Sequence, residues 1–224
     1  MNAFGQLPHP ASPGTSTSLT VVPVRHPASP GTSTSLTVVP VRPPASPGTS
    51  TSLTVAILAD THGQVDRRVV EVVAGCDLAV HGGDVGGAWV LRCLQPRGGR
   101  VIAVAGNNDV ARKWPEAERD LVGHLPDVAE LDLPGGTLTL IHGHQTPARG
   151  RHARLRARYP GARVVVYGHS HRLVADLDSE PWVINPGAAG RERTFGGPSC
   201  MILTATESVW GLEVCRFSAP WRRR

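Results

Sequence analysis

The chain has 224 residues, which is enough for one sizeable domain and too few for two large ones. It has no stretch near the roughly 18 to 20 apolar residues of a membrane span, and its first residues lack the basic start and apolar core of a secretory signal, so we expect a cytoplasmic protein without a membrane partner. The net charge of +5 is compatible with anionic substrates, and the four cysteines form no Cys-x-x-Cys pair, which argues against a zinc knuckle or a redox motif.

A tandem repeat occupies the beginning of the chain. Residues 9–25 read HPASPGTSTSLTVVPVR, and residues 26–42 repeat this segment without a change. A third copy starts at Pro43 and matches at 12 of 17 positions before it diverges. Its Pro, Ser, Thr and Gly content cannot bury enough apolar surface to offset chain entropy. We expect residues 1–51 to be a disordered tail, residues 52–219 to be a single domain, and residues 220–224 to be a short basic tail.

The first half of the domain alternates strand and helix patterns. Leu53 to Ala59 is a short continuous apolar run, typical of a strand that is buried on both faces. Valines then recur at helical spacing at positions 65, 69, 72 and 73, and Gly75 is placed to end this helix. Residues 77–81 and 100–105 predict two more buried strands. This order predicts an α/β fold with parallel pairing.

The second half consists of short strands separated by turns. Residues 129–133 and 137–142 flank Pro134-Gly135-Gly136, which predicts a hairpin. Residues 147–159 have a helical pattern. Further strands are expected at residues 163–167, 173–177, 182–184, 200–205 and 209–217. We predict a mixed α/β domain with two sheets packed together and helices outside.

Metal-capable side chains follow five of the predicted strands. Open α/β sheets place their ligands at this end of the strands, and neighbouring glycines let backbone and ligand approach closely. One such cluster is weak evidence of function, whereas five in order are not expected from chance or from core histidines. The clusters are Asp60-Thr61-His62, Gly83-Asp84, Gly106-Asn107-Asn108-Asp109, His142-Gly143-His144 and Gly168-His169-Ser170-His171.

These motifs resemble the signature of the calcineurin-like metallophosphoesterases. That signature runs Asp-x-His, Gly-Asp, Gly-Asn-His-Asp/Glu, Gly-His and Gly-His-x-His, and the match spans roughly Leu53 to Phe217. The small size and the segment Ile184-Asn185-Pro186-Gly187-Ala188 are more similar to the compact YfcE-type phosphodiesterases than to the larger phosphatases. The resemblance implies a four-layer α/β/β/α sandwich in a single domain.

The resemblance also implies two divalent metal ions that share one carboxylate. One ion would bind Asp60, His62, Asp84 and His171, and the other would bind Asp84, Asn107, His142 and His169. Carboxylate, imidazole and amide ligands suit Mn²⁺, which we expect first, and also Ni²⁺, Fe²⁺, Zn²⁺ or Co²⁺. Two ions ~3.5 to 4 Å apart can hold a bridging hydroxide and stabilise the attacking and leaving oxygens of an in-line displacement.

One position departs from the family signature. Asn108 stands where the phosphatase branch has a histidine that stabilises charge or protonates the leaving group. An asparagine donates hydrogen bonds but cannot deliver a proton near neutral pH, and loss of a general acid typically costs ~10²- to 10⁴-fold in rate. The compact branch also tends to lack this histidine. We therefore expect Asn108 to lie at the reacting centre of a phosphodiesterase.

His144 is the second catalytic candidate. It follows the expected ligand His142 by two residues on the same loop, so we expect it to replace the missing histidine in part. A supporting or solvent-facing histidine is the alternative.

Other polar residues have less specific roles. His81 is expected in the core or in support of the ligands, and Asp109 is expected to orient the Asn107 loop. Asn185 either supports the metal site or forms a plain tight turn. The arginines of the predicted helix form either a solvated face or a rim that guides phosphate, namely Arg149, Arg151, Arg154, Arg156 and Arg158.

The expected function is hydrolysis of a phosphodiester bond in a small phosphoester substrate. A phosphomonoesterase, a nucleotide-specific hydrolase and a non-catalytic scaffold of the same fold, as in the retromer coat, are the alternatives. No additional domain or obvious base-stacking surface is present, so we do not expect a nucleic-acid partner. A homo-oligomer is compatible with the sequence.

Overall fold

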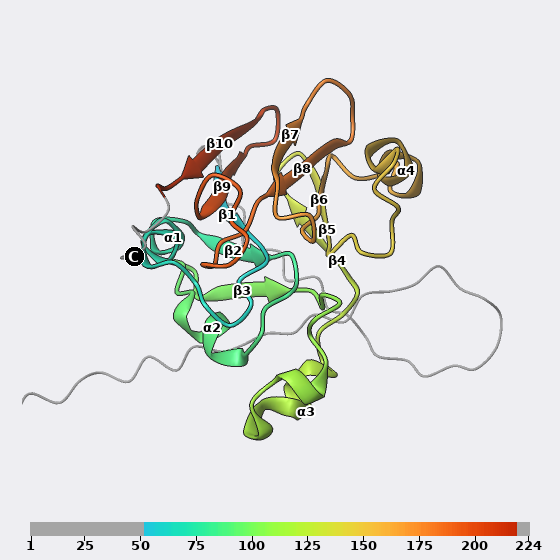
Figure 1. The fold of residues 1–224 in the computed structure, drawn as a ribbon. Coiled ribbons are helices and arrows are strands. Elements are labelled where there is room, and N and C mark those ends of the chain that lie inside the picture. The colour runs from blue at the N-terminus through green and yellow to red at the C-terminus, as the bar shows by residue number, and fades with distance from the viewer. Residues whose placement is uncertain (1–51, 219–224) are drawn as a thin grey trace, which may run out of the picture.

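Two five-stranded mixed sheets lie face to face in the computed structural model, which describes residues 52–218 (Figure 1). The expected tails, residues 1–51 and 220–224, lie outside the described residues. The first sheet has the order β10-β9-β1-β2-β3 and the second has the order β4-β5-β6-β8-β7. Among the described residues, no helix is long and apolar enough to cross a membrane.

The first sheet contains the predicted parallel strands. β1 pairs in parallel with β2, and β2 pairs in parallel with β3, while β9 and β10 add antiparallel strands on the other side of β1. The bounds are Leu53–Leu58 for β1, Leu78–His81 for β2, Arg100–Ala103 for β3, Ser199–Ala205 for β9 and Trp210–Arg216 for β10. Helices α1 (Arg67–Ala74) and α2 (Ala88–Cys93) connect the parallel strands.

The second sheet begins with the predicted hairpin. β4 and β5 pair antiparallel with Leu133 opposite Gly136, and β5 then pairs in parallel with β6. The bounds are Val128–Leu133 for β4, Gly136–Ile141 for β5, Val164–Val166 for β6, Leu173–Asp176 for β7 and Trp182–Pro186 for β8. Helix α4 (Arg151–Arg158) begins later than predicted, because Gly150 adopts a left-handed conformation with a φ of 68° just before it.

Alternating side chains of the central strands explain the layers. On β1, Val55 and Ile57 face the second sheet and share a core with residues such as Leu140 of β5. Their neighbours on the strand, Ala56 and Leu58, face outward and pack with α1 and α2. A third core lies beneath α4 on the outer face of the second sheet. This arrangement confirms the four-layer α/β/β/α sandwich.

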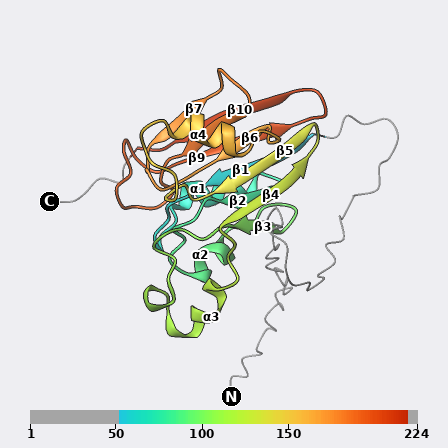
Figure 2. The same ribbon diagram turned by 90° about the vertical axis from the view of Figure 1, so that its right-hand side faces the viewer.

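A segment without a predicted structure connects the two sheets. It contains two 3-10 turns, Ala111–Lys113 and Glu116–Glu118, followed by the single-turn helix α3 (Arg119–Val122). In two perpendicular views this segment extends away from the sheets (Figures 1 and 2). It begins directly after the Asn107 loop, so it extends from one side of the candidate site.

Candidate metal centre

The five metal-capable clusters all follow carboxyl ends of strands, as the sequence predicts. Asp60, Asp84 and Asn107 follow the three parallel strands of the first sheet, while His142 and His169 follow β5 and β6 of the second. Backbone hydrogen bonds join the clusters to each other, among them Asp60 N to Gly83 O at 3.0 Å and Gly168 N to His142 O at 3.0 Å. The loops of both sheets therefore meet at one site.

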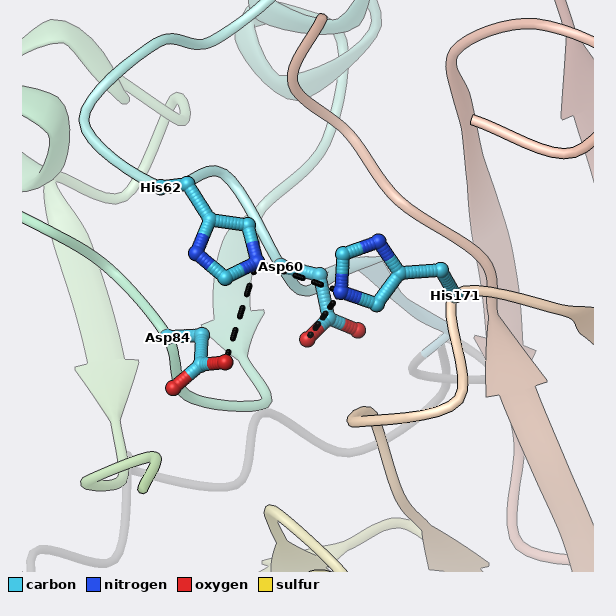
Figure 3. A group of neighbouring side chains, drawn as sticks. All are labelled: Asp60, His62, Asp84 and His171. Carbon is cyan, nitrogen blue, oxygen red and sulfur yellow. Dashed lines mark hydrogen bonds and ion pairs between the residues drawn. The ribbon is translucent and has the colours of Figure 1, made fainter. Parts of the chain in front are cut away.

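Four side chains of this site converge on one point (Figure 3). One ligand-capable atom from each of Asp60, His62, Asp84 and His171 lies within 4.8 Å of the others. The Nε2 atoms of His62 and His171 are 3.1 Å apart, and His171 Nε2 is 3.5 Å from Asp60 Oδ1. Asp60 Oδ2 is buried without a hydrogen-bond partner. Convergent carboxylates and imidazoles with an unpartnered buried oxygen fit a divalent cation.

The remaining expected ligands form a second group around Asn107. Asn107 Oδ1 lies 3.1 Å from His142 Nε2 and 3.0 Å from His169 Nδ1. Asp84 Oδ2 lies 3.5 Å from His142 Nε2 and 3.7 Å from His62 Nε2, so Asp84 stands between the two groups. His142 Nδ1 donates to Gly82 O at 2.8 Å, which leaves Nε2 as the nitrogen that faces the site.

Three of the four expected histidine ligands are held in the neutral form, whereas for His142 the interaction with Asp84 outweighs burial and raises the pKa. Burial lowers the pKa of His171 to about 4, and the positive charge of Arg193 adds to this effect. Burial also lowers the pKa values of His62 and His169. Neutral imidazoles offer a nitrogen lone pair, which a metal ion requires.

The two carboxyl groups differ in their ease of ionisation. Burial raises the pKa of Asp60 to about 7. Burial acts in the same direction on Asp84, yet hydrogen bonds from His142 and Asn108 hold the pKa of that carboxyl well below its usual range. Asp84 is therefore a permanent negative charge at the centre of the site, whereas Asp60 competes with a proton near neutral pH.

The backbone of the site is strained at five expected ligands. Asp60, His62, Asp84, His169 and His171 have φ values of 55°, 47°, 53°, 66° and 56°. Left-handed backbone is unfavourable for residues with a Cβ atom and persists where surrounding structure imposes it, often at functional sites. The sequence carries no signal for this conformation.

Glycines beside the ligands allow the loops to approach each other, as expected. A Cβ atom on Gly106 would lie 2.2 Å from Asp84 N, and one on Gly168 would lie 2.8 Å from Gly82 O. Contacts this short have no room for a side chain, so the ligand geometry requires glycine at both positions.

Asp109 holds two of the ligand loops in place. Asp109 accepts hydrogen bonds from the N–H groups of Gly106, Val85 and Gly86 at 2.9 to 3.0 Å, and from Trp114 Nε1 at 3.1 Å. These bonds confirm the expected orienting role, because they tie the Asn107 loop to the Asp84 loop.

Asn185 braces the loop that carries His169 and His171. Its Nδ2 donates to Gly168 O at 2.7 Å and to Ser170 Oγ at 3.1 Å, while its Oδ1 accepts from Gly187 N at 2.9 Å. Both expected roles, support of the site and formation of a turn, therefore occur together.

His81 lies in the core beside the site. It is fully buried, its Nε2 contacts Thr61 Oγ1 at 2.9 Å, and it is not part of the convergent group. It therefore supports the loop that precedes His62.

The two catalytic candidates lie beside different expected ligands. The Nδ2 of Asn108 donates to Asp84 Oδ2 at 2.8 Å, and Lys113 donates to the amide oxygen of Asn108. His144 is exposed and lies beside two expected ligands, with ring centroids 5.4 Å from His142 and 6.2 Å from His169. Asn108 thus contacts a metal ligand directly, and His144 borders the second group.

Arg193 is a site residue that the sequence analysis did not identify. Its Nη2 lies 3.3 Å from His62 Nε2, and its φ of 51° is the sixth positive value at a non-glycine position among the described residues. It lies in an irregular segment after β8 that has no motif of its own. Arg193 therefore adds a positive group next to the first group of ligands.

The arginines of the predicted helix separate into different environments. Arg151 is buried, Arg156 pairs with Asp176 at 2.5 Å, and Arg149, Arg154 and Arg158 are exposed. A uniformly solvated face is therefore not what the structure shows.

A model of the calcineurin-like phosphoesterase superfamily domain matches residues 53–208. The chain belongs to this superfamily. It is 26% identical over 138 residues to a phosphodiesterase of Methanocaldococcus jannaschii, an alignment that covers 58% of this chain and 81% of that protein. The expected family is therefore confirmed.

Solved structures support the compact fold. An archaeal phosphodiesterase is 24% identical with a TM-score of 0.53, covering 73% of this chain and all of the other. Vacuolar protein sorting 29 of Cryptosporidium parvum is 17% identical with a TM-score of 0.57, covering 75% of this chain and 98% of the other. At these identities the likeness concerns the fold. Both neighbours match over nearly their whole length, as expected for the compact branch.

Proposed function

We propose that the protein hydrolyses phosphodiester bonds with two divalent metal ions. The observation that carries the proposal is the position of Asp84, whose carboxylate contacts a ligand of each group. Asp60, His62, Asp84 and His171 would hold one ion, and Asp84, Asn107, His142 and His169 would hold the other. Mn²⁺ is the ion that we expect first, because the mixed oxygen and nitrogen donors suit it.

The chain itself would position the substrate and the ligands. When bound, the two ions would lower the pKa of the attacking water and offset charge on the phosphoryl oxygens. Arg193 would donate to a phosphate oxygen, because its guanidinium lies at the first group and phosphate is a preferred partner of arginine. Asn108 would hold Asp84 in place, and His144 would donate a hydrogen bond near the leaving group.

A diester is favoured over a monoester by the chemistry at position 108. The side-chain amide of Asn108 cannot deliver a proton at neutral pH. Without a strong general acid the enzyme should depend on good leaving groups. The relative from M. jannaschii is named a phosphodiesterase, which supports the same choice.

A scaffold of the same fold is the second candidate. The fold likeness to vacuolar protein sorting 29 favours it. The convergence of four side chains on one point, together with Asn107, His142 and His169 beside them, supports an enzyme instead.

The direct test is hydrolysis of bis(p-nitrophenyl) phosphate by the purified protein. We expect turnover with Mn²⁺ and slower release from the monoester p-nitrophenyl phosphate. The control is Asp132→Asn, which removes an exposed carboxylate from the hairpin and should leave the rate unchanged. If no diester is hydrolysed with manganese, nickel, iron, zinc or cobalt at verified occupancy, the proposal of an enzyme fails and the scaffold becomes the preferred function.

The role of His144 has its own test. Replacement of His144 by alanine should slow esters with poor leaving groups more than activated nitrophenyl esters, because only poor leaving groups need the hydrogen bond. Equal slowing of both ester types would remove His144 from the reaction.

A further inference from the structure

A recess of about 410 Å³ opens between the start of α4 and the loop after β6. Its wall includes Ser170, which stands between the expected ligands His169 and His171 in the chain. The recess therefore borders the loop that carries these two expected ligands. Its volume is within the range of about 300 to 1,000 Å³ that is common for small-molecule sites. A substituent of a bound phosphoester could occupy it.

Two arginines make the wall of this recess positive. Arg151 opens α4 and is 8% exposed, and Arg172 follows His171 at the exposed rim. Within residues 52–218, neither arginine has a carboxylate at ion-pairing distance, and no acidic residue lines the recess. Arg156, farther along the same helix, is by contrast paired with Asp176.

Burial of an uncompensated charge is costly, which is why buried cations usually have a counter-ion. Arg151 has hydrogen bonds to a neutral carbonyl instead, with its Nε and Nη2 donating to Thr146 O at 3.1 and 3.0 Å. These bonds hold the guanidinium in place but do not neutralise its charge. An anion bound in the recess would neutralise that charge.

The wall that carries Arg151 is fixed before any ligand binds. The guanidinium of Arg151 lies over the ring of Tyr167, 5.4 Å from its centroid. Tyr167 OH is 3.0 Å from His152 Nε2, and His152 Nδ1 is 2.6 Å from Asp176 Oδ2. A side chain that is already ordered loses little entropy on binding, so this geometry favours affinity.

We propose that the recess binds a second phosphate group, carried on one arm of the substrate. The preferred substrates would then be phosphodiesters that bear a terminal phosphate. This inference rests on the proposed function and deepens it. Guanidinium groups bind phosphate through paired, charge-assisted hydrogen bonds, and Arg151 and Arg172 would share this role. An ester without the terminal phosphate would leave both arginines unpaired.

Two chromogenic esters test the inference. One is the p-nitrophenyl ester of thymidine 5′-phosphate, and the other is the same ester with an added phosphate on the 3′-oxygen. Both release the same nitrophenol, so the ratio of their kcat/KM values isolates the second phosphate. We expect the phosphate-bearing ester to be preferred by at least about tenfold, and we expect the preference to shrink as salt rises from about 50 to about 300 mM.

Matched variants assign the preference to the recess. Arg172→Gln should reduce the preference about fivefold or more, because it removes an exposed positive charge from the rim and costs only the stacking of this guanidinium on Phe195, whose ring centroid is 4.4 Å away. Arg154→Gln, an exposed arginine of α4 outside the recess, should leave it unchanged. Arg151→Gln should abolish the preference. Since Arg151 is buried and this variant can fail to fold, Arg172→Gln is the deciding variant.

The outcomes separate this inference from the proposed function. Hydrolysis of both esters with equal kcat/KM, or an unchanged preference in Arg172→Gln, would overturn the inference and leave the phosphodiesterase intact. If neither ester is hydrolysed, the proposed function fails, and calorimetric binding decides the recess alone. Thymidine 3′,5′-bisphosphate should then bind about tenfold more tightly than thymidine 5′-phosphate in the wild type and lose this advantage in Arg172→Gln. Equal binding would overturn the inference.

Discussion

The two groups of ligands at the site differ in how well the protein satisfies them by itself. In the first group, Asp60 Oδ2 is buried without a hydrogen-bond partner, and His171 presents Nε2 to the site while its Nδ1 is buried on the other side of the ring. In the second group, His142 and His169 both contact Asn107 Oδ1, and His142 also donates to Gly82 O. Unpartnered buried polar atoms are costly, so the first group gains more from a cation than the second does.

Exposure separates some members of the two groups in the same direction. Asp60 and His171 are buried, whereas Asn107 is exposed and His169 is half-buried; the remaining members go the other way, since His62 of the first group is half-buried and His142 of the second is buried. A cation in the first group would be shielded from water, while one in the second would remain accessible to substrate. We therefore expect the first group to retain an ion and the second to exchange its ion more readily.

The largest effect is expected where the two groups meet. Asp84→Asn should lower kcat/KM by at least about 10³-fold, because it removes the charge that both ions would share. Metal analysis after dialysis should show loss of both ions. Asp60→Asn is the matched control, since it should affect the first group alone. Retention of two ions by Asp84→Asn would refute the shared position.

The difference in retention can be tested with two alanine variants. His169→Ala should keep one tightly held ion after dialysis, whereas His171→Ala should lose it, because only the latter opens the buried group. Elemental analysis and calorimetric titration with Mn²⁺ would measure this. Equal metal content in the two variants would remove the distinction between the groups.

The residues behind the ligands should have intermediate effects. Asp109→Asn should weaken Mn²⁺ affinity and activity by about 10- to 100-fold, because a carboxamide cannot accept all of the hydrogen bonds from Gly106, Val85 and Gly86. Asn185→Ala should have a similar effect through the His169 loop. Asp132→Asn is the control for both variants and should bind Mn²⁺ as the wild type does. If Asp109→Asn bound Mn²⁺ as tightly as this control, the prediction would be wrong.

The smallest effect is a pH dependence of metal binding. The pKa of Asp60 is raised to about 7 in the metal-free protein, so below pH 7 its carboxyl holds a proton that an ion must displace. Apparent Mn²⁺ affinity should therefore fall by about tenfold per pH unit below 7 for each displaced proton. Calorimetry in two buffers of different ionisation enthalpy should detect more proton release at pH 6 than at pH 8. Equal release at both pH values would contradict it.

The same shift has a consequence for the stability of the metal-free fold. The folded-state pKa of Asp60 lies above the unfolded value of 3.8, so its contribution to stability is complete below about pH 4 and is lost as the pH rises through 7. The lowered pKa values of His171 and His81, both about 4, act oppositely and favour the fold as the pH rises from 4 to 6.5. Bound metal would remove the first of these effects.

Much of the fold could be predicted because its signals are local. The continuous apolar run of β1 follows from burial of both faces of this strand. The valine spacing of α1 follows from burial of one face of this helix. The beginning of α4 was predicted too early, because the left-handed conformation of Gly150 depends on its surroundings. The turns between residues 111 and 122 are too short to show a periodic pattern.

The site could be predicted only as far as residue types and strand ends reveal it. All seven expected ligands meet at one edge of the two sheets. The hydrogen bond from Asn108 to Asp84, in contrast, depends on side-chain geometry that the sequence does not reveal. Arg193 has no motif, and it reaches the site through a loop whose path the sequence does not encode locally. Whether each ligand binds a metal ion stays a prediction.

The pairing of β1 with β9 sets the order in which the protein can mature. Leu53 lies opposite Ala205, so the strand that precedes Asp60 is hydrogen-bonded on one side to the far end of the domain. During synthesis that side of β1 has no partner until residues 199–205 have left the ribosome. Contacts this distant in sequence form late and slowly. The loop after β1, which carries Asp60 and His62, can therefore reach its final geometry only after nearly the whole domain has been translated.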